Sequence, residues 1–174
     1  QVLRAFNDGR GLVEILIKYF PIAYGADVQT LRGLEFPFHK RAQLNMLLMH
    51  GRASSSASAF GHGILPLVTD IEEVAFIADY DVPNGQRFKG ALIYNLELAE
   101  RVDNWQPVPK DSPMEISIRG GSASTSVKFE NLVNKIRERS GFKKIFICHH
   151  DFWWWMMGKS TGMFSQVTPD TSSY

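Results

Sequence analysis

The sequence predicts a mainly β fold, an antiparallel β-sandwich of the jelly-roll type with one or two helices; an α/β fold is the alternative. Two runs, GALIYNLELAERV and MEISIRGGSAS, are rich in residues that favour strands. The connector between them, DNWQPVPKDSP, holds three of the chain's eight prolines. Long strands that pair across proline-rich loops are typical of antiparallel sandwiches.

The composition predicts one globular domain. The chain has 174 residues, of which 44% are apolar and 21% charged, so we expect a single β-rich domain over residues 1–166 and a polar tail over residues 167–174. Lysine and arginine total 19 against 18 acidic residues, which excludes a global field that would attract nucleic acid. The single cysteine excludes an intrachain disulfide and suits a cytoplasmic location, and the apolar runs are too short to span a bilayer.

The N-terminal third is predicted to contain two strands and a helix. Residues 12–24, LVEILIKYFPIAY, are rich in β-branched and aromatic residues, which favours a strand over a short helix stopped by Pro21. Residues 34–38 predict a short edge strand, because Pro37 has no N–H to donate to a ladder. Residues 42–50 predict a helix of about two turns from the spacing of their leucines.

The middle of the chain is predicted to hold a loop, two strands and a turn. Residues 51–63, GRASSSASAFGHG, are small and polar and indicate an exposed loop. Residues 64–68 and 74–81 are short apolar runs that we interpret as strands. The Asn-Gly dipeptide within residues 83–86 favours a tight turn.

The C-terminal third is predicted to hold the clearest helix. Residues 126–140 begin at a serine and carry apolar side chains in one stripe at helical spacing. Residues 142–148, FKKIFIC, indicate a strand. Trp153, Trp154 and Trp155 follow. Either they lie on a central strand with both faces buried, or a partner covers one face.

Five residues are candidates for a metal site. Asp79 and Asp81 end a predicted strand and would share one face of it, where paired carboxylates bind Mg²⁺ or Mn²⁺. His149, His150 and Asp151 follow the last predicted strand, and neutral imidazoles and a carboxylate are ligands for a divalent metal. The alternative is a solvated polar turn, because neighbouring residues on an extended chain point to opposite faces.

These residues resemble the motifs of the DHH phosphoesterase family. That family places an Asp-x-Asp after an early strand and an Asp-His-His after a later one, so the resemblance implies a degenerate phosphoesterase that uses Mn²⁺ or Mg²⁺. The chain departs from the pattern at Cys148 and at Arg119, because the family has aspartate at both places. A metal-dependent phosphoesterase is therefore the alternative hypothesis for function.

The favoured resemblance is to the jelly-roll capsid proteins of picorna-like viruses, particularly those of invertebrates. It rests on ALIYNLELAERVDN, the proline-containing connector, PMEISIRGGSAS and the short segment LEFPFHKR. It implies a structural protein without catalytic residues, metal or cofactor, which assembles with copies of itself or with related capsid subunits into an icosahedral shell. It also implies a location in the virion or the host cytoplasm, and a loop, GRASSSASAFGHG, that meets a host receptor.

Overall fold

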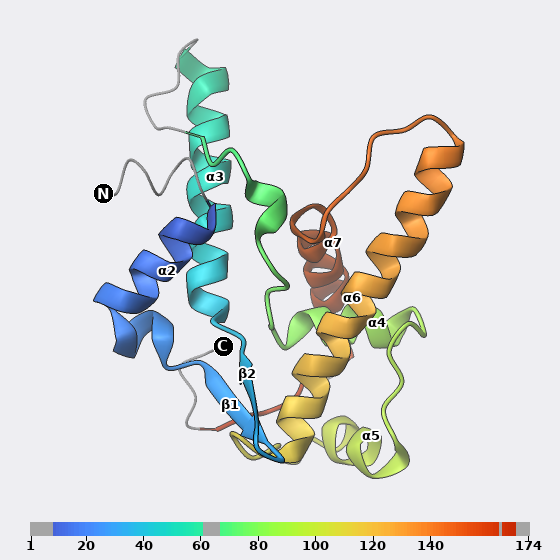
Figure 1. Cartoon of the computed structure of the whole chain (residues 1–174). Helices are drawn as coiled ribbons and strands as arrows, with labels where there is room; N and C mark the ends of the chain where they lie inside the picture. The colour runs from blue at the N-terminus through green and yellow to red at the C-terminus, as the bar shows by residue number, and fades with distance from the viewer. Residues whose placement is uncertain (1–8, 61–66, 164, 170–174) are drawn as a thin grey trace. The chain divides into compact units, whose positions relative to one another are not determined.

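The protein is mainly helical in the part of the chain that the structure describes. The structure is a computed structural model and describes residues 9–60, 67–163 and 165–169. Within these ranges the only strands are β1 (Val28–Leu31) and β2 (Leu34–Pro37), which pair as a two-stranded sheet (Figure 1). The predicted β-sandwich is therefore wrong, and the parallel sheet that the α/β alternative requires is not formed by these residues either.

The chain forms two compact units. Unit 1 comprises Gln1–Val28 and Pro37–Ile77, and unit 2 comprises Gln29–Phe36 and Ala78–Tyr174. The β-rich character expected for residues 1–166 is wrong in both units, whereas the division into one domain and a polar tail over residues 167–174 stays a prediction.

Unit 1 is built on two helices, α2 (Gly9–Tyr19) and α3 (Lys40–Phe60). A π-helical turn, η1 (Pro21–Gly25), follows α2, and a 3₁₀ turn, η2 (Ile71–Glu73), follows α3 in the chain. The buried apolar residues of this unit form one cluster: Leu12, Leu16, Ala42, Met46, Val68, Val74 and Ile77. The two leucines from α2 are four residues apart, so the 12–24 segment buries one helical face, and the strand predicted there is wrong.

Helix α3 confirms the predicted helix at 42–50 and extends it. Residues 51–60 continue the helix, so the loop predicted over 51–63 is wrong there, and residues 61–63 lie outside the described residues. The small residues fit a helix because Ala53 packs at 1% exposure. The edge strand predicted at 34–38 is confirmed as β2. Of the two strands predicted next, at 64–68 and 74–81, residues 64–66 are not described, residues 67–68 and 74–80 form no strand, and Asp81 begins a helix.

Unit 2 contains four helices in its described residues: α4 (Asp81–Phe88), α5 (Leu96–Asp103), α6 (Pro113–Arg139) and α7 (Ile147–Ser160). The strands predicted after residue 78 in this unit are wrong. GALIYNLELAERV runs into α5, MEISIRGGSAS lies within α6, and residues 142–146 are irregular. The turn predicted at 83–86 lies inside α4. The helix predicted at 126–140 is confirmed as the C-terminal half of α6.

Local capping explains why the apparent strands are helical. Ser112 accepts a hydrogen bond from the Glu115 N–H at 3.2 Å, and Pro113 occupies the first helical position of α6. Asn95 caps α5 in the same way, by accepting from the Leu98 N–H at 2.9 Å. Helices α5 and α6 then bury Leu98, Val102 and Ile118 against Val108 in a second apolar cluster.

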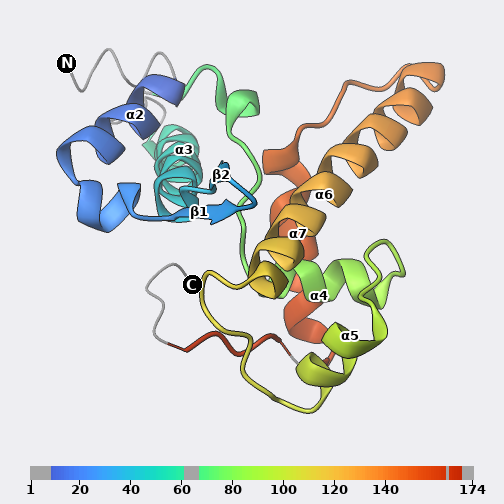
Figure 2. The same cartoon turned by 60° about the horizontal axis from the view of Figure 1, so that its bottom comes forward.

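Helix α7 packs directly on α4, and α6 lies beside both helices (Figures 1 and 2). Glycine permits this approach, because a Cβ on Gly85 would meet the Trp154 carbonyl and a Cβ on Gly158 would meet the Asp81 carbonyl. Trp154 is 2% exposed and Trp153 is 44% exposed. A helix turns adjacent residues to different sides, so the central-strand interpretation of the tryptophans is wrong. None of the described helices combines the length and apolarity that a membrane crossing requires.

Candidate active site

Polar side chains of unit 2 gather where α4 begins and α7 ends. The Asp81 carboxylate is buried, with Lys159 Nζ 2.9 Å from its Oδ2 and Ser165 Oγ donating to its Oδ1 at 3.1 Å. The Asp81 N–H donates to Asp79 Oδ1 at 2.7 Å. Asp79 is partly exposed, so this backbone bond orients a carboxylate that solvent reaches.

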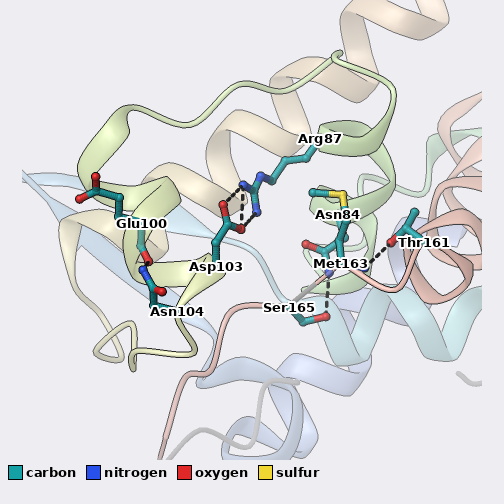
Figure 3. A network of polar contacts seen from close by, with 8 residues as sticks. All are labelled: Asn84, Arg87, Glu100, Asp103, Asn104, Thr161, Met163 and Ser165. Atoms are coloured by element: carbon teal, nitrogen blue, oxygen red, sulfur yellow. Dashed lines mark hydrogen bonds and ion pairs between the residues drawn. The ribbon is translucent and has the colours of Figure 1, made fainter.

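The segment after α7 completes this cluster. Asn84 Nδ2 donates to Ser165 Oγ at 2.8 Å, and the Met163 N–H donates to Thr161 Oγ1 at 3.1 Å (Figure 3). Asn84 on α4 and Ser165 beyond α7 are 81 positions apart in the chain. Their contact fixes the chain that follows α7 against the first turns of α4.

A second pair of charges lies further along α4. Both terminal nitrogens of Arg87 donate to Asp103 Oδ1 at 3.1 Å, which joins α4 to α5 (Figure 3). The guanidinium also lies 4.4 Å from the centre of the Tyr94 ring. Burial is the largest cause that raises the pKa of Tyr94, so this phenol stays protonated.

A third cluster, at the start of α6, joins the buried side chains of Gln29 and Glu115 to the exposed Asp111. Gln29 Nε2 donates to Glu115 Oε2 at 2.7 Å and to Asp111 Oδ1 at 3.1 Å. The Asp111 N–H also donates to Glu115 Oε2. Glu115 is 1% exposed, so its carboxylate serves to hold the β1–β2 hairpin on α6.

The N-terminal half of α7 contains a buried histidine among aromatic rings. The His150 ring lies 5.1 Å from the centre of the Phe129 ring, and its Nε2 is 3.9 Å from Glu130 Oε2. Burial, and then the charge of His149, lower the pKa of His150 to about 4. Burial also raises the pKa of Glu130. At neutral pH His150 is therefore an uncharged ring.

The structure does not bring the predicted metal ligands together. Asp79 and Asp81 lie at the start of α4, whereas His149, His150 and Asp151 lie in the first turns of α7. Asp81 pairs with Lys159, nine residues beyond His150, which corresponds to about 14 Å along a helix. Among the described residues no group of three or more His, Cys, Asp or Glu side chains is placed to hold a metal ion.

Several residues of the polar cluster around Asp81 were not predicted from the sequence. Lys159, Asn84 and Ser165 have no local pattern that distinguishes them from surface polar residues. Gly85 and Gly158 carry the signal that was available, because an isolated glycine within a helical segment indicates a close backbone approach. Without knowledge that 81–88 and 147–160 are helical, that signal could not be read.

Unit 1 has a cavity of its own. It is open to solvent, has a volume of about 250 Å³, and is lined by Val13, Glu14, Ile17, His39, Gln43, Glu73 and Val74. The Ala75 N–H donates to Gln43 Oε1 at 3.2 Å beside it.

Comparison with known proteins decides between the functional hypotheses. A family profile described as queuosine salvage protein matches residues 2–170. The chain belongs to this family. It is similar to proteins named queuosine 5'-phosphate N-glycosylase/hydrolase, with 33% identity over 111 residues to that of Sphaerobacter thermophilus, which is 64% of this chain and 32% of the relative. Identity to that of Dictyostelium discoideum is 28% over 169 residues, which is 97% of this chain and 47% of the relative.

Membership of the queuosine salvage family shows that the capsid hypothesis and the phosphoesterase hypothesis are both wrong. The matched part of the chain spans 32% and 47% of the length of these two curated relatives. The capsid function, the shell of identical subunits and the virion location are wrong, because the matched relatives are named as enzymes of nucleotide hydrolysis. The phosphoesterase hypothesis is wrong for the same reason, and no metal cluster forms among the residues that the structure describes.

Proposed function

We propose that this chain takes part in the hydrolysis of the N-glycosidic bond of queuosine 5'-phosphate. The observation that supports the proposal is the family match over residues 2–170, together with the activity for which the relatives are named. In this reaction the bond between ribose C1′ and the base nitrogen breaks, and its electron pair leaves with the base. The hydroxyl group of water adds to C1′ and a proton is taken up by the base nitrogen, so the products are the free base and ribose 5-phosphate.

This chemistry requires a positioned carboxylate. As the bond to the base lengthens, C1′ gains positive charge, which a nearby carboxylate stabilises. The same group accepts a proton from the attacking water. Glycoside hydrolases use carboxylates for these two tasks, and the charge requirement at the sugar carbon is the same for an N-glycoside.

Asp79 fits this role better than the other carboxylates of the polar clusters in unit 2. Asp81 is buried and committed to Lys159 and Ser165. Glu115 is buried and committed to the hairpin. Asp79 is partly exposed and is held by the N–H of Asp81 at the start of α4. We therefore assign Asp79 as the catalytic carboxylate of the proposed reaction.

The proposal is tested by incubating the purified chain with queuosine 5'-phosphate and following the free base by chromatography. We expect the wild-type chain to release base, and Asp79→Asn to lower kcat by on the order of 10²-fold or more, because the amide neither carries charge nor accepts the proton. Glu138→Gln, which removes an exposed carboxylate from the far part of α6, serves as the control and keeps wild-type activity. No release by the wild-type chain, or full activity of Asp79→Asn, contradicts the proposal.

A further inference from the structure

The Asp81 carboxylate is held by groups from the C-terminal end of α7 and the segment after it. It is 5% exposed, and a buried carboxylate is stable as an anion only with a cation or several donors close to it. Lys159 supplies the cation at 2.9 Å, and Ser165 supplies a hydroxyl donor at 3.1 Å. Both partners are more than 75 residues away in the sequence, so the chain's fold has brought them to this carboxylate.

Lys159 is suited to hold this position. Its ammonium lies 5.0 Å from the centre of the Trp155 ring, one turn earlier on the same helix. The hydrogen bond to Asp81 and the negative charge of Asp81 raise the pKa of Lys159. Lys159 ends α7 and Asp81 begins α4, so each charge also has the sign that its helix terminus favours.

The anchored Asp81 acts on its neighbour through the backbone. Its N–H is the donor that holds Asp79 Oδ1 at 2.7 Å. Gly158 lies against the Asp81 carbonyl, so α7 constrains the peptide group that follows Asp81. A rotation of Asp81 away from Lys159 would therefore change the direction in which Asp79 presents its carboxylate.

We propose that Lys159 is a positioning residue: its ion pair with Asp81, supported by Ser165, fixes the first turn of α4 and so aims the Asp79 carboxylate at the sugar. The inference rests on the function proposed above for Asp79. Lys159 touches neither the substrate nor the water in this arrangement. It acts mainly through Asp81, with which it makes its hydrogen bond, and its charge also acts on the nearby Asp79 carboxylate, so its removal affects the rate of the chemical step more than substrate binding.

The kinetic test compares Lys159→Met with Lys159→Arg in the purified chain. The methionine keeps an unbranched stem and loses the charge, and we expect kcat for queuosine 5'-phosphate to fall between about tenfold and about a hundredfold with KM nearly unchanged, as for a small misplacement of a catalytic group. The arginine keeps the cation and restores most of kcat. Ser165→Ala lowers kcat in the same direction by less. Lys128→Met, which removes an exposed lysine of α6, leaves kcat unchanged.

A second measurement does not depend on activity. The amide proton resonance of Asp81 reports its hydrogen bond to Asp79, and we expect Lys159→Met, but not Lys128→Met, to shift it by NMR. If Lys159→Met shifts the resonance but the wild-type chain releases no base, the result supports the contact between Lys159 and the Asp81–Asp79 backbone and contradicts the proposed function. An unshifted resonance together with wild-type kcat in Lys159→Met overturns the inference, even if the melting temperature falls.

Discussion

His150 is a buried histidine whose ring stays neutral at physiological pH. It is 4% exposed, and neither ring nitrogen has a hydrogen-bond partner among the described residues. The titratable groups that face it are Glu130 from α6 and its neighbour His149. A protonated ring here would be poorly solvated, and this lack of solvation is the main reason why the pKa of His150 falls to about 4.

This burial makes stability depend on pH. The unfolded chain binds a proton at His150 near pH 6.5, whereas the folded chain does so only near pH 4. Between these values the unfolded state binds more protons, so the free energy of unfolding falls as the pH falls, by about 3 kcal/mol at pH 4. Urea unfolding at pH 7 and pH 4 measures this loss, and the loss is expected to shrink in His150→Phe.

Glu130 provides the control for the pH experiment. Burial raises its pKa, so its contribution runs in the opposite direction and favours the folded state as the pH falls. In Glu130→Gln the loss of stability on acidification is therefore at least as large as in the wild-type chain. A pH dependence that is the same in His150→Phe as in the wild-type chain would show that His150 is not its source.

Helices α4 and α7 meet through two glycines rather than through interlocking side chains. Gly85 and Gly158 place backbone against backbone, and this contact brings Lys159 within reach of Asp81. The arrangement also explains the burial of six consecutive residues in α4, from Asp81 to Gln86. Gln86, the last of these buried residues, joins α4 to α6, because its Nε2 donates to Ser126 Oγ at 3.0 Å.

A methyl group at this crossing should force the helices apart. We expect Gly158→Ala to lower the free energy of unfolding by about 3 kcal/mol, because the new Cβ overlaps the Asp81 backbone and backbone cannot move aside as a side chain can. Thermal unfolding followed by circular dichroism measures the change. Gly120→Ala is the matched control in α6, where a Cβ meets nothing within 4 Å. There alanine should stabilise the helix by about 0.5–1 kcal/mol, and equal effects at both glycines would refute the close-contact explanation.

Most of the errors in secondary structure came from β-branched runs that are helical. The residues of MEISIRGGSAS favour strands on average, but Ser112, Pro113 and Glu115 before and within it form a helix start that overrides this tendency. The stripe at 126–140 predicts its helix correctly, because four apolar residues repeat at helical spacing. Even there, Leu132 and Ile136 remain 60% and 56% exposed, so the pattern identified a helix and not a buried face.

The two compact units are interleaved along the chain. The hairpin residues 29–36 belong to unit 2, although the residues on both sides of them belong to unit 1. Gln29 is the polar link that joins this hairpin to α6, through Glu115 and Asp111. The stability of unit 2 therefore depends on a residue that precedes the rest of it by about 50 positions.

Removal of this link tests the interleaved arrangement. Gln29→Met leaves the Glu115 carboxylate buried with one donor fewer, and we expect the free energy of unfolding to fall by about 2–3 kcal/mol. Urea denaturation measures the change. Gln106→Met, at an exposed position of the same unit, should stay within about 0.5 kcal/mol of the wild-type chain. A loss for Gln29→Met no larger than for Gln106→Met would mean that the hairpin does not contribute to unit 2.

Local sequence patterns determined only those features that neighbouring residues decide, namely the helices at 42–50 and 126–140 and the short strand β2. The composition determined the near-zero net charge. They also drew attention to Asp79 and Asp81, but for a metal site that the described residues do not form. The partner of Asp81 is Lys159, 78 residues later, and it becomes a partner only because Gly85 and Gly158 let two helices touch. Helical and strand periodicities extend over a few residues, whereas contacts between helices depend on how whole elements pack, so the candidate site emerged only from the folded chain.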